Sequence, residues 1–175
     1  MRLFILAVVC SAAALLSGCA TIDSAQGGAA LDRNAKWALL PILNHTDVPQ
    51  AGLRAEAITE TLLRARGVGN LLRYPPALNP ETLFEPTERK AQEEAQKWAR
   101  SQGARYAVYG AVDEWRYKVG VDGEPAVGVM LAVLDLQSGE VAWSAVGGKS
   151  GWSREALAAV AQKLIRDLIG SARIQ

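Results

Sequence analysis

The sequence predicts a single-domain α/β sandwich, with a mixed sheet of roughly five strands and three helices in the order βαβαβββα. Residues 105–117 form the longest β-favouring stretch of the chain, and two further apolar runs follow it up to Val146. The segments on either side carry apolar residues at helical spacing along one side only. Helices of that kind cover a sheet, so the fold is built around residues 105–146.

The first half of the domain is predicted as strand, helix, strand and helix. Residues 36–43 are a short apolar run typical of a buried strand, and Pro41 predicts an edge or a bend at its end. A helical apolar stripe runs through residues 51–66, and Gly67 is placed to end that helix. The elements that follow are a short strand, a loop and a second helix, at 70–74, 77–86 and 87–102.

The second half is predicted as three strands and a final helix. A Gly-containing loop at 137–140 is typical of a hairpin. Residues 147–152 are predicted as a flexible connection. The three strands are expected at 106–117, 126–136 and 141–146, with a turn at 120–125 between the first two. The final helix is expected at 153–169.

The N-terminus has the pattern of a secreted lipoprotein. Arg2 precedes an apolar run that is too short to span a bilayer comfortably, which favours a signal peptide over a permanent membrane helix. The residues Leu16, Ser17, Gly18 and Cys19 resemble a bacterial lipobox, in which the cysteine thiol is acylated. We therefore expect a signal peptide at 1–18, a lipidated flexible tether at 19–34 and one periplasmic domain at 35–175. In the lipoproteins that this motif resembles, Ala20 in place of aspartate points to the periplasmic face of the outer membrane.

Charge and composition exclude several functional classes. The chain has 19 Lys and Arg against 18 Asp and Glu, and the leader holds only Arg2, so the mature domain is neutral and no nucleic-acid partner is expected. Both cysteines, Cys10 and Cys19, precede the domain, which excludes disulfides and cysteine catalysis there. His45 is the single histidine, so no multi-imidazole zinc site is possible. We expect no metal and no cofactor.

No catalytic constellation is present. Residues 147–150 resemble a fragment of a phosphate loop, but position 143 is Trp where that motif requires glycine. His45 follows the first predicted strand and is either an acid or base there or a structural or interface residue. A hydrolase would need an acidic pair around a cleft, and neighbours such as Asp113 and Glu114 point to opposite faces of a strand.

Two groups of residues are candidates for binding. Trp152, with Lys149 and Arg154 beside it, is typical of a loop that touches lipid headgroups, although the indole could also fold back on the final helix. The second group is acidic and is either a solvated face or, repeated around a ring, a negatively charged mouth that attracts cations. Its members are Asp113, Glu114, Asp122, Glu124 and Asp135.

Several blocks of the sequence together resemble the PelC lipoproteins of bacterial Pel polysaccharide export. The similarity extends from Lys36 onward, and residues 114–128 are its most specific part. The blocks are 36–42 with Asn44 and His45, 49–52, 74–76, 114–118, 122–128, and Gly151 with Trp152.

The resemblance implies a non-enzymatic outer-membrane lipoprotein that forms a high-order periplasmic ring under a β-barrel export porin. It guides a cationic exopolysaccharide through an acidic ring face, and a Trp directed at the membrane corresponds to Trp152. Trp115, Arg116 and Tyr117 are candidates for the ring interface, although Trp115 and Tyr117 could instead pack within the fold. The alternative is a structural lipoprotein that assists assembly of an outer-membrane complex without touching polysaccharide.

Overall fold

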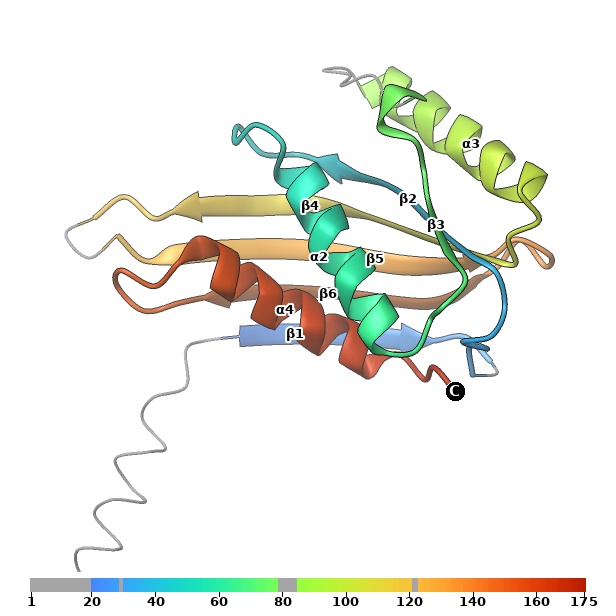
Figure 1. The fold of residues 1–175 in the computed structure, drawn as a ribbon. Helices are drawn as coiled ribbons and strands as arrows, with labels where there is room; N and C mark the ends of the chain where they lie inside the picture. The colour runs from blue at the N-terminus through green and yellow to red at the C-terminus, as the bar shows by residue number, and fades with distance from the viewer. Residues whose placement is uncertain (1–19, 29, 79–84, 121–122) are drawn as a thin grey trace, which may run out of the picture.

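A computed structural model describes residues 20–28, 30–78, 85–120 and 123–175 and confirms a single α/β domain (Figure 1). Its sheet is mixed and has six strands in the described residues, in the order β1-β6-β5-β4-β2-β3. The strands are β1 (Ala20–Gln26), β2 (Trp37–Asn44), β3 (Leu71–Arg73), β4 (Tyr106–Tyr117), β5 (Pro125–Asp135) and β6 (Val141–Ser150). The helices are α2 (Ala51–Ala65), α3 (Glu85–Ser101) and α4 (Leu157–Ser171), with a short 3-10 turn at Pro76–Leu78.

The sheet changes from parallel to antiparallel pairing at β4. β2 runs parallel to both β3 and β4, as the crossovers through α2 and α3 require. The remaining neighbours β4, β5, β6 and β1 pair antiparallel. The predicted organising stretch is therefore a central strand of the sheet, paired with β2 on one side and with β5 on the other.

The main core lies between the sheet and the two helices α2 and α4, which cross the same face of it (Figure 1). Alternate residues of β4 and β5 point into this core, and Val108, Leu131 and Leu164 of α4 are among its fully buried members. A second, smaller core lies under α3, where Ala95 and Ala99 pack on β2 and β4. Small residues suffice there because α3 covers only part of the sheet, as its narrow apolar stripe predicted.

Pro41 lies within β2, beyond the three residues that pair with β3, and the strand adapts around it. The pairing of β2 with β4 shifts register between Leu39 and Ile42, because proline has no N–H to give to a neighbouring strand. The Ile42 N–H instead donates to Glu56 Oε1 of α2 at 3.1 Å, and the Pro41 carbonyl accepts from Gln92 Nε2 of α3 at 2.9 Å. The predicted bend is thus a bulge that ties β2 to both covering helices.

The predicted flexible tether is wrong for residues 20–26, which form β1. This strand pairs with β6 along its length and adds the sixth strand. Leu31, further along the predicted tether, is buried and forms a parallel bridge with Ile174. Ile22 is the only large apolar residue of β1, so the sequence of this strand lacks an alternating apolar pattern. The strand forms because its backbone pairs with the distant strand β6.

Residues 147–150 are also not the predicted flexible connection, because β6 continues through Ser150 and α4 begins at Leu157 instead of residue 153. Gly147 allows close packing: a Cβ there would lie 2.8 Å from the Thr21 carbonyl oxygen and 3.1 Å from Leu164 Cδ1. These residues therefore form a strand against β1 and α4, and not a loop that could cradle a phosphate.

Candidate functional site

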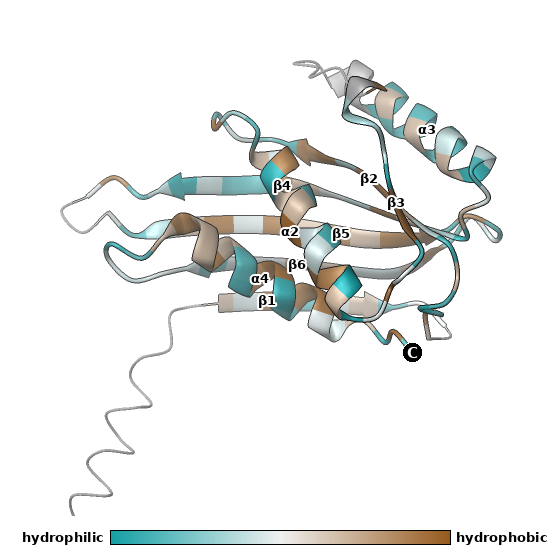
Figure 2. Ribbon diagram, in the orientation of Figure 1, coloured by the Kyte–Doolittle hydropathy of each residue, from teal (hydrophilic) through white to brown (hydrophobic). Residues whose placement is uncertain are grey.

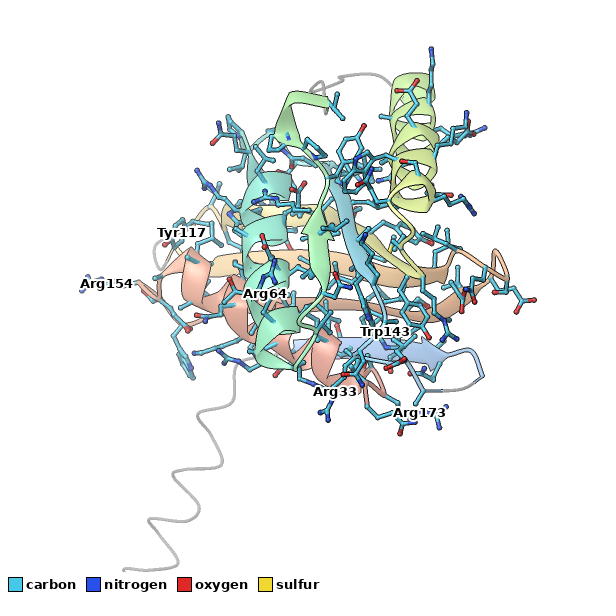
Figure 3. All side chains as sticks on the ribbon, turned by 45° about the vertical axis from the view of Figure 1, so that its right-hand side comes forward. Arg33, Arg64, Tyr117, Trp143, Arg154 and Arg173 are labelled. Carbon is cyan, nitrogen blue, oxygen red and sulfur yellow. The ribbon has the colours of Figure 1, made fainter. Side chains whose placement is uncertain are left out.

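Three segments that are far apart in the sequence meet at one end of the sheet: the start of β1, the β4–β5 hairpin and the loop between β6 and α4 (Figure 1). The Gly151 N–H donates to the Pro125 carbonyl at 2.8 Å, which joins the loop to the hairpin. Tyr117 Oη donates to the Glu155 carbonyl at 3.2 Å and accepts from the Leu157 N–H at 3.1 Å. We call this the Trp152 end, and Tyr117 and Arg154 mark it in Figure 3.

The loop at the Trp152 end exposes its aromatic side chain while its backbone is held. Trp152 is 54% exposed, so it does not fold away against α4. Its N–H donates to Glu155 Oε2 at 3.1 Å, and Glu155 Oε1 pairs with Lys163 Nζ at 2.6 Å. The Lys163 ammonium, together with the Trp152 N–H, lowers the pKa of the Glu155 carboxyl. A fixed loop thus presents an indole to the outside.

The two cations predicted beside Trp152 differ in their surroundings. Arg154 is exposed, has a positive φ of 66°, and projects from the loop (Figure 3). Lys149 is on β6 and is partly buried, and its Nζ lies 3.3 Å from Asp167 of α4. Arg154 is therefore the cation available to a headgroup, and Lys149 mainly ties β6 to α4.

Three of the predicted acidic residues lie toward the Trp152 end, where β4 is hydrophilic (Figure 2). Each one has a basic side chain as its neighbour. The pairs join Asp113 Oδ1 to His45 Nδ1 at 2.9 Å, Glu114 Oε1 to Arg116 Nε at 3.0 Å, and Glu124 Oε2 to Lys118 Nζ at 3.9 Å. A bulge in β4 between Val112 and Glu114 breaks the alternation that would separate Asp113 from Glu114.

Asp135 does not join this group. It lies opposite Tyr106 at the far end of β4, and its side chain is only 18% exposed. Its Oδ1 accepts the Gln137 N–H at 2.9 Å and closes the β5–β6 turn, while Oδ2 lies 3.6 Å from Arg105 Nε. Its role is therefore structural. Asp122, the remaining member, lies outside the described residues.

The predicted interface residues are also separated by the structure. Trp115 is 2% exposed and belongs to the main core, so the prediction that it faces another copy is wrong. The bulge at Asp113 turns Trp115 inward, which the sequence pattern alone does not show. Arg116 is exposed and Tyr117 half exposed, and both remain on the surface of the Trp152 end.

Other features of the site set limits on its chemistry. His45 bonds to Asp113 at the carboxyl end of β2, which favours the structural or interface interpretation over an acid or base. Within the described ranges, no group of three or more His, Cys, Asp or Glu side chains is arranged to hold a metal. No helix in those ranges is long and apolar enough to cross a membrane. Cys19 lies outside the described residues.

Two features of the Trp152 end were not predicted. Val119, near the tip of the β4–β5 hairpin, is fully exposed, and Ala20 of β1 lies opposite Lys149. The exposure of Val119 could have been predicted, because this valine precedes Gly120 in a predicted turn. The pairing of β1 has no local signal.

The comparison with solved structures decides the family. The chain is 40% identical to the PelC dodecamer from Paraburkholderia phytofirmans, with a TM-score of 0.75, covering 90% of this chain and 99% of that one. The chain belongs to the PelC family. A variant PelC dodecamer from the same organism gives 41% identity, a TM-score of 0.76, and coverage of 90% of this chain and 100% of that one.

The chain also shares its fold with a more distant lipoprotein. GNA1162 from Neisseria meningitidis is 18% identical, with a TM-score of 0.54 over 78% of this chain and 96% of that one. No family model and no curated protein matched the sequence.

Proposed function

We propose that this PelC homologue is a non-enzymatic outer-membrane lipoprotein. Acylated at Cys19, it assembles into a closed periplasmic ring and guides a cationic exopolysaccharide to a β-barrel export porin during secretion of biofilm matrix. The observation that carries the proposal is 40% identity over 90% of the chain with a PelC that forms a dodecamer. Identity at that level over the whole domain supports the same assembly in both proteins.

A closed ring needs two different surfaces on each copy that fit one another. Arg116 and Tyr117 are the interface candidates that remain at the surface, and arginine and tyrosine are enriched at such contacts. Val146 offers a further apolar contact on the face of the sheet away from α4. It is 48% exposed, whereas its neighbour Ala145 packs into the main core on the opposite face.

Guidance of a cationic polymer is assigned to Asp113, Glu114 and Glu124. Their contacts with His45, Arg116 and Lys118 are exposed. Exposed ion pairs contribute only about 0–1 kcal/mol each, so an ammonium group of the polymer can replace the resident basic side chain at little cost. Repetition around the ring adds many such weak contacts without creating a tight one. The polymer would be attracted and still move.

Contact with the outer membrane is assigned to Trp152 and Arg154, with Lys149 behind them. The indole is suited to the interface between acyl chains and headgroups, and the exposed guanidinium to anionic headgroups. This orients the Trp152 end toward the membrane.

The assembly is tested by electron microscopy and sedimentation of the domain from Ala20 to Gln175 without acyl groups. Rings of uniform size are expected. A monodisperse monomer at high concentration would count against the guide-ring function.

The guiding surface is tested by the binding of chitosan oligomers, a soluble cationic polysaccharide. The parent should bind weakly and lose binding as salt rises, because screening weakens contacts between exposed charges. The double variant Asp113→Asn and Glu114→Gln should bind several-fold less. The control is Glu93→Gln with Glu94→Gln, which removes an equal charge from exposed neighbours on α3 and should leave binding unchanged. Equal loss in both double variants would remove the assignment to the Trp152 end.

A second function is favoured by one observation, the contact of Asp113, Glu114 and Glu124 each with a basic side chain of the same chain. If those pairs only stabilise the surface, the protein is a structural lipoprotein that assists assembly of an outer-membrane complex without touching polysaccharide. Rings that show no salt-sensitive binding of the polycation would support this function instead.

A further inference from the structure

The folded domain begins one residue after the proposed acylation site. β1 starts at Ala20, and Cys19 is joined to it by a single peptide bond. Consecutive Cα atoms are about 3.8 Å apart, whereas a flexible tether of fifteen residues would span roughly 20 Å. The acyl chains and the sheet are therefore separated by almost no chain.

β1 is held along its length rather than frayed from the sheet. All seven residues have partners on β6, from Ala20 opposite Lys149 to Gln26 opposite Trp143. Ile22 packs against the main core over Gly147, where any side chain would collide with β1. After the strand, the Gly27 N–H donates to the Ala142 carbonyl at 2.9 Å.

The C-terminal segment fixes the other end of the strand. Gln26 Oε1 accepts the Arg173 N–H at 3.1 Å, and Arg173 Nη2 donates to the Gly28 carbonyl at 2.8 Å. Pulling β1 from the sheet would therefore break contacts with both β6 and the residues after α4. Because β1 is fixed in this way, the whole domain keeps one orientation relative to the first residue of the strand.

The first residue of β1 lies at the Trp152 end. Beside Ala20 is Lys149, and Lys118 Nζ of the hairpin donates to Ser150 Oγ at 2.8 Å. From β1 across β6 and β5 to β4 are three strand spacings, or about 14 Å. The start of β1, the loop that holds Trp152 and the β4–β5 hairpin thus form one row at the same end of the sheet, with the hairpin projecting beyond the level of Ala20 (Figure 1).

We propose that β1 is a rigid continuation of the lipid anchor, which seats this row on the bilayer so that Val119 and Trp152 contact lipid together. The inference rests on the acylation of Cys19 in the proposed function. It adds to that function the hairpin tip as a second contact and a fixed orientation of the domain that does not depend on the ring.

A lipid bilayer is the expected partner of this surface, because a single peptide bond separates Ala20 from the acylated Cys19. Acyl chains on Cys19 lie in the bilayer, so Ala20 is at its surface and the row beside it faces the same headgroups. Val119 is fully exposed, so its side chain is available to a lipid surface. Among the described residues, Arg154 has no carboxylate partner, while the nearby acid Glu155 is paired with Lys163. The row therefore offers apolar groups and an unpaired cation to an anionic surface.

The test uses the full lipidated chain in vesicles that contain phosphatidylglycerol. The mature body has no thiol, because Cys10 leaves with the leader and Cys19 is acylated, so Val119→Cys accepts a single fluorophore. The matched control is Glu140→Cys in the exposed β5–β6 turn at the opposite end of the sheet. The measurement is collisional quenching by a lipid-attached quencher relative to a water-soluble one.

The expected result is a quenching ratio several-fold higher at position 119 than at position 140. A flexible Gly/Ser segment of about a dozen residues, beginning with Ala and inserted between Cys19 and Ala20, should reduce that difference strongly because the anchor no longer fixes the orientation. Equal quenching at the two positions would overturn the lipid contact of the hairpin. An unchanged difference after the insertion would overturn the rigid anchor.

Mass spectrometry of the N-terminal peptide distinguishes failure of this inference from failure of the proposed function. Acylated chains with equal quenching refute this inference and leave the membrane attachment in the proposed function standing. Chains that carry no acyl group at Cys19 refute the membrane attachment in the proposed function, and the rigid anchor with it. A monomeric but correctly oriented chain refutes the guide ring and supports the anchor.

Discussion

The replacement of Trp115 by alanine separates a role in the core from a role in the ring interface. The indole is 2% exposed and packs within the main core opposite Val127, so it has almost no surface left for another copy. A buried tryptophan covers about 150–250 Å² and its truncation to alanine costs about 3–5 kcal/mol. We expect Trp115→Ala to lower the free energy of unfolding by about 4 kcal/mol.

The same deletion at Trp152 is the matched control, because that side chain is 54% exposed. Trp152→Ala removes the same atoms but leaves no cavity, so its free energy of unfolding should change by less than about 1 kcal/mol. Both variants are measured by urea unfolding of the domain from Ala20 to Gln175 at neutral pH. With a slope of about 2 kcal/mol per molar urea, the midpoint should fall by about 2 M for Trp115→Ala.

One outcome would refute this reasoning. If Trp115→Ala kept the parental midpoint while the sedimentation coefficient fell to that of a monomer, Trp115 would belong to the interface and not to the core. A total stability of about 5–15 kcal/mol leaves most of the variant folded, so the comparison can be made.

The remaining predictions concern backbone packing and pH. Gly52→Ala should destabilise the domain by about 1–3 kcal/mol, because the new Cβ would collide with the Ile42 carbonyl, whereas Gly170→Ala in α4, with open space around it, should be neutral or stabilising in the same unfolding assay. The pKa of the Glu155 carboxyl is lowered, so its contribution to stability is present above about pH 4.5 and is lost as the pH falls through the folded pKa. Glu155→Gln should therefore make the urea midpoint less dependent on pH in that acidic range. An unchanged pH profile would contradict the assignment. Burial raises the pKa of the Glu56 carboxyl, so its contribution is present below about pH 4.5 and is lost as the pH rises through the folded pKa; Glu56→Gln should remove this opposite trend, and a loss of stability that is equal at all pH values would show that titration is not involved.

The elements with strong local patterns were predictable from the sequence. The stretch that begins at residue 105 became β4, the helical stripe at residues 51–66 became α2, and the hairpin loop at 137–140 joins β5 to β6. Each of these elements depends on apolar periodicity and turn residues within a short stretch of sequence. That stretch specifies the type of element without information from neighbouring strands.

The failures have a common cause in contacts between distant residues. β1 has a single large apolar residue and exists because Gly147 of β6 leaves room for it. Trp115 is buried because a bulge at Asp113 shifts the alternation of β4 by one residue. Asp135 left the acidic group because antiparallel pairing places it opposite Tyr106, although only 22 positions separate it from Asp113 in the sequence.

The sequence by itself determined the fold class, the family resemblance and the expectation of a lipid anchor, because helical spacing, β propensity and the short motif ending in Cys19 are local properties of the chain. Only the tertiary structure decided what lies beside that anchor. Strand pairing is a long-range property, and it is the pairing of β1 with β6 that brings Ala20, Trp152 and Val119 to the same end of the sheet.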